Sequence, residues 1–260
     1  MSAVAPETGL LAEVGAIARE AGTAILAIYR DEFAVQHKDD ASPLTAADLA
    51  AQRVIAAGLA RIAPDVPVLS EEARAAPWDQ RRSWSRYWLV DPLDGTREFV
   101  KRNGEFTVNV ALIENTLPVL GVVCAPALGT LYAGATGGPA TMRSDGKTQS
   151  LRCRAVPVEG LTVVASASHG DVGALDEFLK GRRVAARRAI GSSLKLCLVA
   201  AGAADLYPRF GRTMEWDIAA GHAVLAAAGG SVTDLSGAPL RYGKPGFENP
   251  AFVARGIAVP

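Results

Sequence analysis

WLVDPLDGT, residues 88–96, is an apolar run that ends in two carboxylates, Asp91 and Asp94, with a proline between them. An apolar run bounded by turn residues predicts a buried strand. A strand end of this shape can turn both carboxylates and the Leu93 carbonyl toward one point, and such an oxygen cage suits Mg²⁺. The stretch therefore predicts a metal site at the end of a core strand.

Gly95 and Thr96 close the same stretch and precede a short helix expected over residues 97–102. Backbone N–H groups at a helix start bind phosphate oxygens readily, so a metal and a phosphate could meet here. For an isolated pair of this kind, an ordinary Asp-Gly turn between two strands is the alternative.

Two other acidic sites also stand at the end of a strand or the start of a helix. Glu71 and Glu72 follow the apolar run at residues 68–70, and Asp217 stands at an expected helix start. Three such carboxylate sites fit a two-metal phosphatase, in which the ions stabilise both the entering and the leaving oxygen. Separate acidic loops on a surface would give the same pattern.

The charge balance of the chain excludes several classes of partner. Its 27 Lys and Arg residues equal its 27 Asp and Glu residues, so no overall field draws it to a nucleic-acid polymer or to an anionic membrane. The basic run at residues 182–188 is typical of a solvated surface. With 49% hydrophobic and 21% charged residues, the chain has the composition of a globular protein.

No disulfide, zinc site or transmembrane segment is expected. Cys124, Cys153 and Cys197 are odd in number and show no paired metal-binding spacing, which suggests buried thiols in a reducing compartment. The N-terminal residues lack the basic and apolar blocks of an export signal. Residues 115–142 carry no charge, but Gly and Pro interrupt them too often for a membrane helix, so we expect them to form sheet core.

The first half of the chain is expected to be α+β. Apolar residues recur at helical spacing over residues 10–28. A second helix should begin after the loop at residues 39–44, with Thr45 as its cap and Asp48 in its first turn. Short apolar or alternating runs predict strands at residues 66–70, 87–90, 107–113, 119–125 and 130–135.

From residue 161 strands and helices alternate, which indicates an α/β second half. The change in the order of strands and helices places a domain boundary near residues 155–160. We therefore expect two domains, residues 1–157 with most of the acidic sites and residues 158–260 with Asp217. In the second half we expect helices at residues 171–180, 192–201 and 215–228. We expect strands at residues 161–166, 205–207 and 231–233.

Three motifs resemble, in order and spacing, the metal-site motifs of the lithium-sensitive inositol monophosphatase superfamily. They are Ser70–Glu72, Asp91–Thr96 and Trp216–Asp217. Within that superfamily, the 3'(2'),5'-bisphosphate nucleotidases of the CysQ type are similar to this chain at residues 91–113, 191–200 and 206–211. The similarity runs from the first expected helix to about Asn249, so it covers nearly the whole chain.

The resemblance implies a two-domain, layered α-β-α-β-α sandwich of the inositol monophosphatase/fructose-bisphosphatase type, with the active site between the domains. It also implies inhibition by lithium. Glu72 is either a ligand of a further, weaker metal or an adjacent charge. Two or three Mg²⁺ ions per site are implied, with the ligands Glu71, Asp91, Leu93, Asp94 and Asp217.

The resemblance also pairs Asp48 with Thr96. Mg²⁺ would neutralise the phosphate ester and lower the pKa of the attacking water. The Thr96 hydroxyl is then expected to take the proton, with Asp48 orienting it and accepting in turn. The alternative for Asp48 is a helix cap with no catalytic role.

The expected substrate contacts lie on both halves of the chain. In the second half, Ser168 and His169 follow a strand, and Ser192 and Lys195 lie where a helix begins. His169 could contact adenine, and Lys195 could hold the ribose or a second phosphate. The full expected set is Glu71, Leu93, Asp94, Gly95, Thr96, Ser168, His169, Ser192, Lys195, Arg209 and Asp217.

Two of these residues allow another interpretation, and one neighbouring position leaves a contact open. His169 is equally compatible with a plain loop residue, and Arg209 with a surface or interface charge. Ala167 stands where the resembling enzymes carry a basic residue, so the contact to the 5'-end of a nucleotide stays open.

These expectations together describe an Mg²⁺-dependent enzyme that hydrolyses the 3'-phosphate of adenosine 3',5'-bisphosphate to AMP and phosphate in the bacterial cytoplasm, linked to sulfur assimilation. An inositol-1-phosphatase or another sugar phosphatase of the superfamily is one alternative. A non-catalytic nucleotide- or protein-binding scaffold is the other, and the complete set of acidic residues argues against it. Use of 3'-phosphoadenylyl sulfate, a homodimer, and peripheral attachment to the cytoplasmic side of the inner membrane are left open.

Overall fold

The computed structural model describes residues 8–30, 35–37, 43–166 and 172–257. Its first elements are two helices with a small antiparallel strand pair between them. The apolar spacing that predicted the first helix becomes its buried face, and the second helix begins directly after Thr45, its expected cap, so both helices are confirmed. Most of the loop expected at residues 39–44 lies outside the described residues. The elements are α1 (Thr8–Arg30), β1 (Val35–His37), β2 (Pro43–Thr45) and α2 (Ala46–Ile62).

A seven-stranded sheet follows, in the order β3-β4-β5-β6-β7-β8-β9. β3 and β4 run parallel, and every other neighbouring pair is antiparallel. The strands are β3 (Val68–Ser70), β4 (Arg86–Asp94), β5 (Thr107–Glu114), β6 (Leu117–Ala125), β7 (Thr130–Ala135), β8 (Ala140–Ser144) and β9 (Lys147–Leu151). The connections contain α3 (Trp78–Arg81), α4 (Thr96–Val100) and the 3₁₀ turn η1 (Pro126–Leu128).

A second sheet of five strands has the order β11-β10-β12-β14-β13. β10 is parallel to both of its neighbours, and β14 is antiparallel to both of its own. The strands are β10 (Leu161–Ser166), β11 (Val184–Ile190), β12 (Leu206–Arg209), β13 (Ser231–Asp234) and β14 (Phe252–Arg255). The helices among them are α5 (Val172–Leu179), α6 (Leu194–Ala200) and α7 (Glu215–Ala227).

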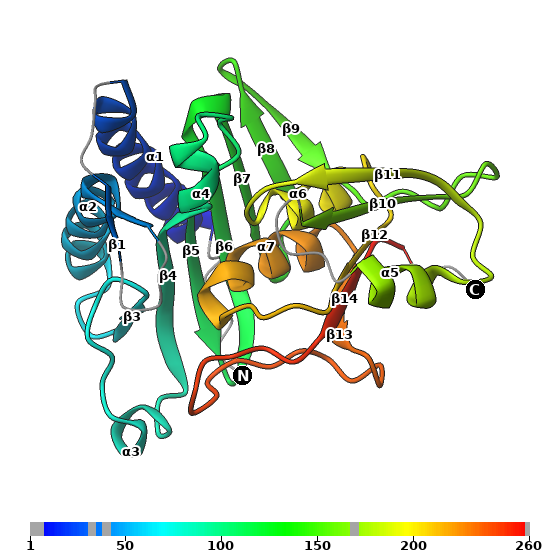
Figure 1. Ribbon diagram of the computed structural model, residues 1–260. Coiled ribbons are helices and arrows are strands. Elements are labelled where there is room, and N and C mark those ends of the chain that lie inside the picture. The colour runs from blue at the N-terminus through cyan, green and yellow to red at the C-terminus, as the bar shows by residue number, and fades with distance from the viewer. Residues whose placement is uncertain (1–7, 31–34, 38–42, 167–171, 258–260) are drawn as a thin grey trace.

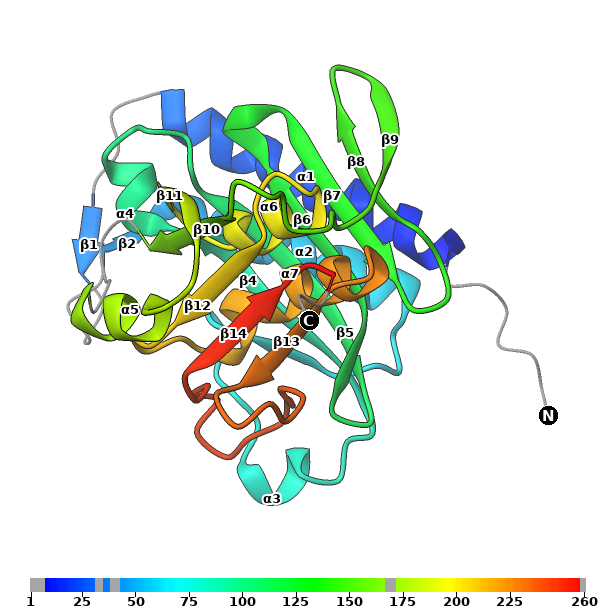
Figure 2. The same cartoon turned by 90° about the vertical axis from the view of Figure 1, so that its right-hand side faces the viewer.

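The elements stack in five layers (Figures 1 and 2). α1 and α2 cover one face of the seven-stranded sheet, and α6 and α7 lie between the two sheets. α5 packs on the outer face of the five-stranded sheet, where Leu175 and Phe178 meet Leu161, Val163 and Val253. The expected α-β-α-β-α sandwich is therefore confirmed.

β4 shows how the core places the acidic residues. Trp88 and Val90 belong to the core beneath α1 and α2, whereas Leu89 belongs to the core that holds α6 and α7. A strand buried on both faces needs a continuous apolar run, which is what the sequence has here. Because side chains alternate along a strand, Asp91 follows Leu89 onto the face between the sheets.

α7 packs directly on β6 of the larger sheet. A Cβ atom on Gly121 would lie 2.2 Å from the carbonyl oxygen of Ala220, so only glycine allows this approach. α7 comes from the second half of the sequence, yet its contacts lie on both sheets. The boundary expected near residues 155–160 falls between β9 and β10, and the two-domain division stays a prediction.

Several short elements were not predicted from the sequence. The β8–β9 hairpin is largely exposed, so its strands carry no alternating apolar signal. β14 has four residues and becomes a strand only between β12 and β13, which come from earlier parts of the chain. α3 is a single turn.

Two expectations about the whole chain can be compared with the structure. Cys124, Cys153 and Cys197 are free, buried thiols, as expected. Among the described residues, no helix combines the length and the apolar character that crossing a membrane requires.

Candidate active site

The end of β4 turns its carboxylates out of the strand ladder. The pairing with β5 shifts register between Asp91 and Asp94, which interrupts the ladder at Pro92 and Leu93. Asp91 Oδ1 accepts the Leu93 N–H at 3.0 Å and fixes this turn. Gly95 follows with a φ of +90°, a conformation that favours glycine, and α4 begins at the next residue.

The start of α7 brings a third carboxylate to the same place. Asp217 Oδ2 accepts the Met214 N–H at 2.8 Å and closes the first turn. The fully buried Glu215 carboxylate accepts the N–H groups of Gly243 and Lys244, each at 2.9 Å, and pairs with Lys244 Nζ at 2.6 Å. These contacts anchor the helix start, and Asp217 with it, to the loop before β14.

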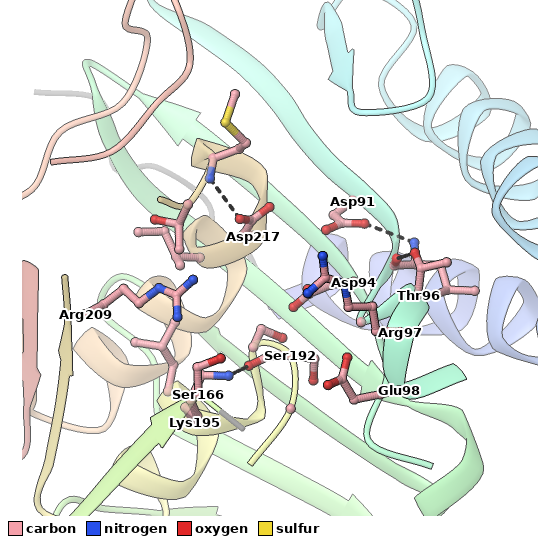
Figure 3. A pocket seen from close by; sticks show the side chains of 18 of the residues that line it. Asp91, Asp94, Thr96, Arg97, Glu98, Ser166, Ser192, Lys195, Arg209 and Asp217 are labelled. Carbon is pink, nitrogen blue, oxygen red and sulfur yellow. Dashed lines mark hydrogen bonds between the residues drawn. The ribbon is translucent and has the colours of Figure 1, made fainter. Parts of the chain in front are cut away.

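A cavity of about 430 Å³ lies between the two halves of the chain. One side, the acidic wall, carries Asp91 and Asp94, with Arg97 beside Asp94 and with Asp217 projecting from α7 (Figure 3). The other side, the cationic wall, carries Lys195 and Arg209. The expected site residues that line it are Glu71, Asp91, Leu93, Asp94, Gly95, Thr96, Ser192, Lys195, Arg209 and Asp217.

The acidic side chains act strongly on one another. Burial, followed by the charges of Glu71 and Asp94, raises the pKa of Asp91 well above its ordinary value. Burial and the Asp94 charge do the same to the pKa of Asp217. Burial raises the pKa of Asp94 to about 6, although the Lys195 ammonium opposes that rise. So much negative charge in one place indicates a cation site.

The donor chemistry of the acidic wall fits Mg²⁺, because every expected ligand atom is a carboxylate or carbonyl oxygen. In the part of the chain that the structure describes, no three His, Cys, Asp or Glu side chains already surround one ion position. Like charges push such side chains apart, and a divalent cation would reverse that repulsion. The individual ligands stay predictions that this donor chemistry supports.

Lys195 lies on the cationic wall, but its ammonium already has partners. Nζ donates to the carbonyl oxygens of Ile190 at 3.1 Å and Ser192 at 2.5 Å, and it lies 5.4 Å from the centre of the Tyr207 ring. Burial lowers the pKa of Lys195 to about 8, while the Asp94 charge opposes that shift. An ammonium has three donors, so one N–H remains for a ligand.

Two of the expected residues do not line the cavity. Asp48 is buried in the first turn of α2 and does not line the cavity, although its charge contributes to the raised pKa of Asp91. Glu72 is not among the lining residues either. The catalytic role of Asp48 therefore stays a prediction.

The nucleotide contacts expected after β10 lie outside the described residues. They are Ser168 and His169, together with the unusual Ala167. Ser166, the last residue of β10, does line the cavity.

The cavity also contains residues that the sequence analysis did not single out. Arg97 and Arg212 line it, and Arg209 Nη2 donates to the Arg212 carbonyl at 3.0 Å. Ser193 lines it as well and connects it to Asn109, a buried polar residue on β5. A polar residue on the core face of an otherwise apolar strand is the signal that could have identified Asn109.

The profile of the inositol monophosphatase family matches residues 7–257. The chain belongs to the inositol monophosphatase family. Among curated members of that family, the 3'(2'),5'-bisphosphate nucleotidase CysQ of Escherichia coli (strain K12) is 50% identical over 246 residues, which are 94% of this chain and 98% of that protein.

Solved structures of the family agree with this placement. The crystal structure of CysQ from Bacteroides thetaiotaomicron matches with a TM-score of 0.84 and 39% identity, covering 96% of this chain and 98% of the other. An IMPase from Thermotoga maritima matches with a TM-score of 0.77 and 27% identity, covering 93% and 89%. The predicted family and fold are both confirmed.

The first prediction concerns the charge of Asp94 and can be tested without substrate. Mg²⁺ at about a hundred times its Kd should stabilise the parent by about 2.7 kcal/mol, or roughly 5 to 10 °C in unfolding temperature. Asp94→Asn should lose most of that rise, because it removes a charge that holds a hard cation. Without metal the variant should be at least as stable as the parent, since one repulsive charge is gone.

Glu177→Gln is the matched control, because Glu177 is an exposed residue of α5 far from the cavity lining. It should respond to Mg²⁺ as the parent does. An Asp94→Asn protein with the full response would contradict the metal-site assignment.

Proposed function

We propose that this chain is a 3'(2'),5'-bisphosphate nucleotidase that hydrolyses the 3'-phosphate of adenosine 3',5'-bisphosphate to AMP and phosphate. The observation that carries the proposal is the division of one cavity into an acidic and a cationic wall. The acidic wall suits a phosphate that reacts with the help of metal ions, and the cationic wall suits a second anionic group on the same molecule. The 50% identity with the E. coli nucleotidase supports the same function.

The rival functions fit this cavity less well. Inositol 1-phosphate has no second anionic group for Lys195, Arg209 and Arg212. A non-catalytic scaffold would have no use for several buried carboxylates that raise each other's pKa. The proposal includes a cytoplasmic location and a place in sulfur assimilation, as the name CysQ of the relatives suggests.

The proposed cofactor is Mg²⁺, two or three ions per site. When bound, it neutralises the phosphate and makes the attacking water more acidic. The residues that would hold it are Glu71, Asp91, Leu93 through its carbonyl, Asp94 and Asp217.

Thr96 and Asp48 are proposed to move the proton. Thr96 Oγ1 lies 3.5 Å from the Leu93 carbonyl, a contact weak enough for the hydroxyl to leave. The hydroxyl takes a proton from the attacking water as it gives its own to the Asp48 carboxylate. The water oxygen forms its bond to phosphorus, the bond from phosphorus to the ribose 3'-oxygen breaks, and solvent protonates that oxygen.

The second prediction tests the substrate directly. Purified protein with Mg²⁺ should release phosphate from adenosine 3',5'-bisphosphate much faster than from inositol 1-phosphate, because only the first has a group for the cationic wall. Lithium should inhibit at concentrations where sodium and potassium do not, since a small monovalent ion can enter an oxygen site sized for Mg²⁺ with half the charge. A clear preference for the inositol ester would overturn the proposed substrate.

The third prediction concerns Thr96 and Asp48 as a unit. Thr96→Ala should lower kcat with little change in KM, because it removes a proton acceptor and leaves the carboxylates in place. Asp48→Asn should do the same, and the double variant should be no slower than the slower single variant. Losses that add up fully would mean that the two residues act independently.

The fourth prediction separates bisphosphate from monophosphate binding at Lys195. A partly desolvated contact between an ammonium and a phosphate contributes about 1.5 to 3 kcal/mol, so Lys195→Ala should cost roughly ten- to a hundred-fold in kcat/KM for adenosine 3',5'-bisphosphate. Adenosine 3'-monophosphate should react about equally well with parent and variant. An equal loss on both substrates would mean that Lys195 serves the loop it bonds to, through the Ile190 and Ser192 carbonyls.

A further inference from the structure

Three buried polar side chains connect the two walls of the cavity. Thr107 and Asn109 lie on β5, and Ser193 precedes α6. Ser193 Oγ donates to Asn109 Oδ1 at 2.7 Å and lies 2.9 Å from Thr107 Oγ1. A serine hydroxyl has one proton, so Thr107 must be the donor to Ser193. The result is a directed hydrogen-bond chain from Thr107 through Ser193 to Asn109.

This chain of hydrogen bonds lies against the acidic wall. In the β4–β5 ladder Asn109 is the partner of Asp91, and Thr107 is the partner of Asp94. Cross-strand partners place their side chains on the same face of a sheet, a few ångströms apart. The backbone N–H of Ser193 also donates to the Asp94 carboxylate. Ser193 therefore touches one expected metal ligand directly, and Asn109 stands beside another.

The other end of the Asn109 amide is a donor. Its Nδ2 is buried and has no hydrogen-bond partner among the residues that the structure describes. An unpaired buried donor costs about 1 to 3 kcal/mol, so its presence needs a reason. Because Oδ1 is held by Ser193, Nδ2 is turned away from Ser193 on the face that Asn109 shares with Asp91. The reversed amide would bring its oxygen toward negative charge, which electrostatics disfavours.

The loop that carries Ser193 is pressed firmly against the first half of the chain. Glu105 Oε2 accepts the Gly191 N–H at 2.7 Å. A Cβ atom on Gly191 would lie 2.6 Å from Glu98 Cγ and 2.8 Å from the Glu105 carbonyl oxygen. Ser193 thus sits in a close-packed seam, where a hydrogen bond fixes position rather than merely adding stability.

We propose that Ser193 and Asn109 are positioning residues for phosphate-ester hydrolysis: Ser193 orients Asp94 through its N–H and holds the Asn109 amide, and Asn109 presents Nδ2 as a donor to the acidic wall. The inference rests on the proposed function, because it assigns these residues to the same site. Groups that hydrogen-bond to metal-binding carboxylates fix the direction of the ligand oxygens. The hydrogen bonds from Thr107 through Ser193 to Asn109 also fix the position of the loop before α6 relative to the end of β4.

The test uses Ser193→Ala and Asn109→Leu, the second of which keeps the side-chain size without its polar atoms. Each should weaken Mg²⁺ binding, measured by calorimetric titration without substrate, by roughly ten- to a hundred-fold. At saturating Mg²⁺, kcat should fall by a similar factor and KM for adenosine 3',5'-bisphosphate should stay near the parent value. The double variant should be no worse than the worse single variant, because both changes break one chain.

Thr233→Val is the matched control, because it removes a buried hydroxyl that has no partner among the described residues and does not line the cavity. It should leave Mg²⁺ binding and kcat unchanged. Folded Ser193→Ala and Asn109→Leu proteins with the Mg²⁺ affinity and kcat of the parent would overturn the proposal.

A further pair of variants covers the case in which Ser193→Ala does not fold. Thr107→Val removes only the hydroxyl that donates to Ser193, and Thr107→Ser keeps it. Thr107→Val should bind Mg²⁺ more weakly than Thr107→Ser, and equal affinities would overturn the proposal. The Mg²⁺ titration needs no nucleotide, so it tests the role of Ser193 and Asn109 independently of the substrate. A parent protein that prefers inositol 1-phosphate would refute the proposed function without changing the outcome of the Mg²⁺ titration.

Discussion

The repulsion among buried carboxylates is the constraint on which the rest of this structure depends. Asp91, Asp94 and Asp217 each have a raised pKa because they are buried close to one another. On flexible loops such groups would simply move apart. Here one is held by a turn at a strand end and another by the start of α7, and α7 packs so closely on β6 that Gly121 has no room for a side chain. The layered core therefore supplies the rigidity that the charge cluster needs.

The cationic wall is built differently, from loops and short elements of the second half. Lys195 donates to the carbonyl oxygens of Ile190, at the end of β11, and of Ser192, in the loop before α6. Arg209 donates to the carbonyl oxygen of Arg212. Backbone oxygens therefore help to place both cations in the cavity that also contains the acidic wall. Two cations in a cavity with an acidic wall suit a ligand that carries one metal-bound phosphate and a second anion.

The sequence predicted the parts of the site that depend on local pattern. The apolar run before Asp91, the short helix after Gly95 and the apolar spacing of α1 are visible in local stretches of the sequence, and each is confirmed. The Ser193–Asn109 bond joins residues 84 positions apart, so no local pattern contains it. The hydrogen bond from Lys195 to the Ser192 carbonyl also depends on the loop backbone, where Ser192 has a φ of +47°. A serine rarely adopts a positive φ, so its residue type does not predict this conformation, which depends on packing.

Both walls of the cavity depend on the layered core. The acidic wall comes from strand ends and a helix start that are fixed by the core, and the fold is shared with an IMPase at 27% identity and a TM-score of 0.77. The cationic wall is carried by α6 and β12, and Lys195 is itself buried, so the core holds this wall as well. Ser193 and Asn109 lie where the two walls meet, so they constrain how far the loop can move as its contacts change.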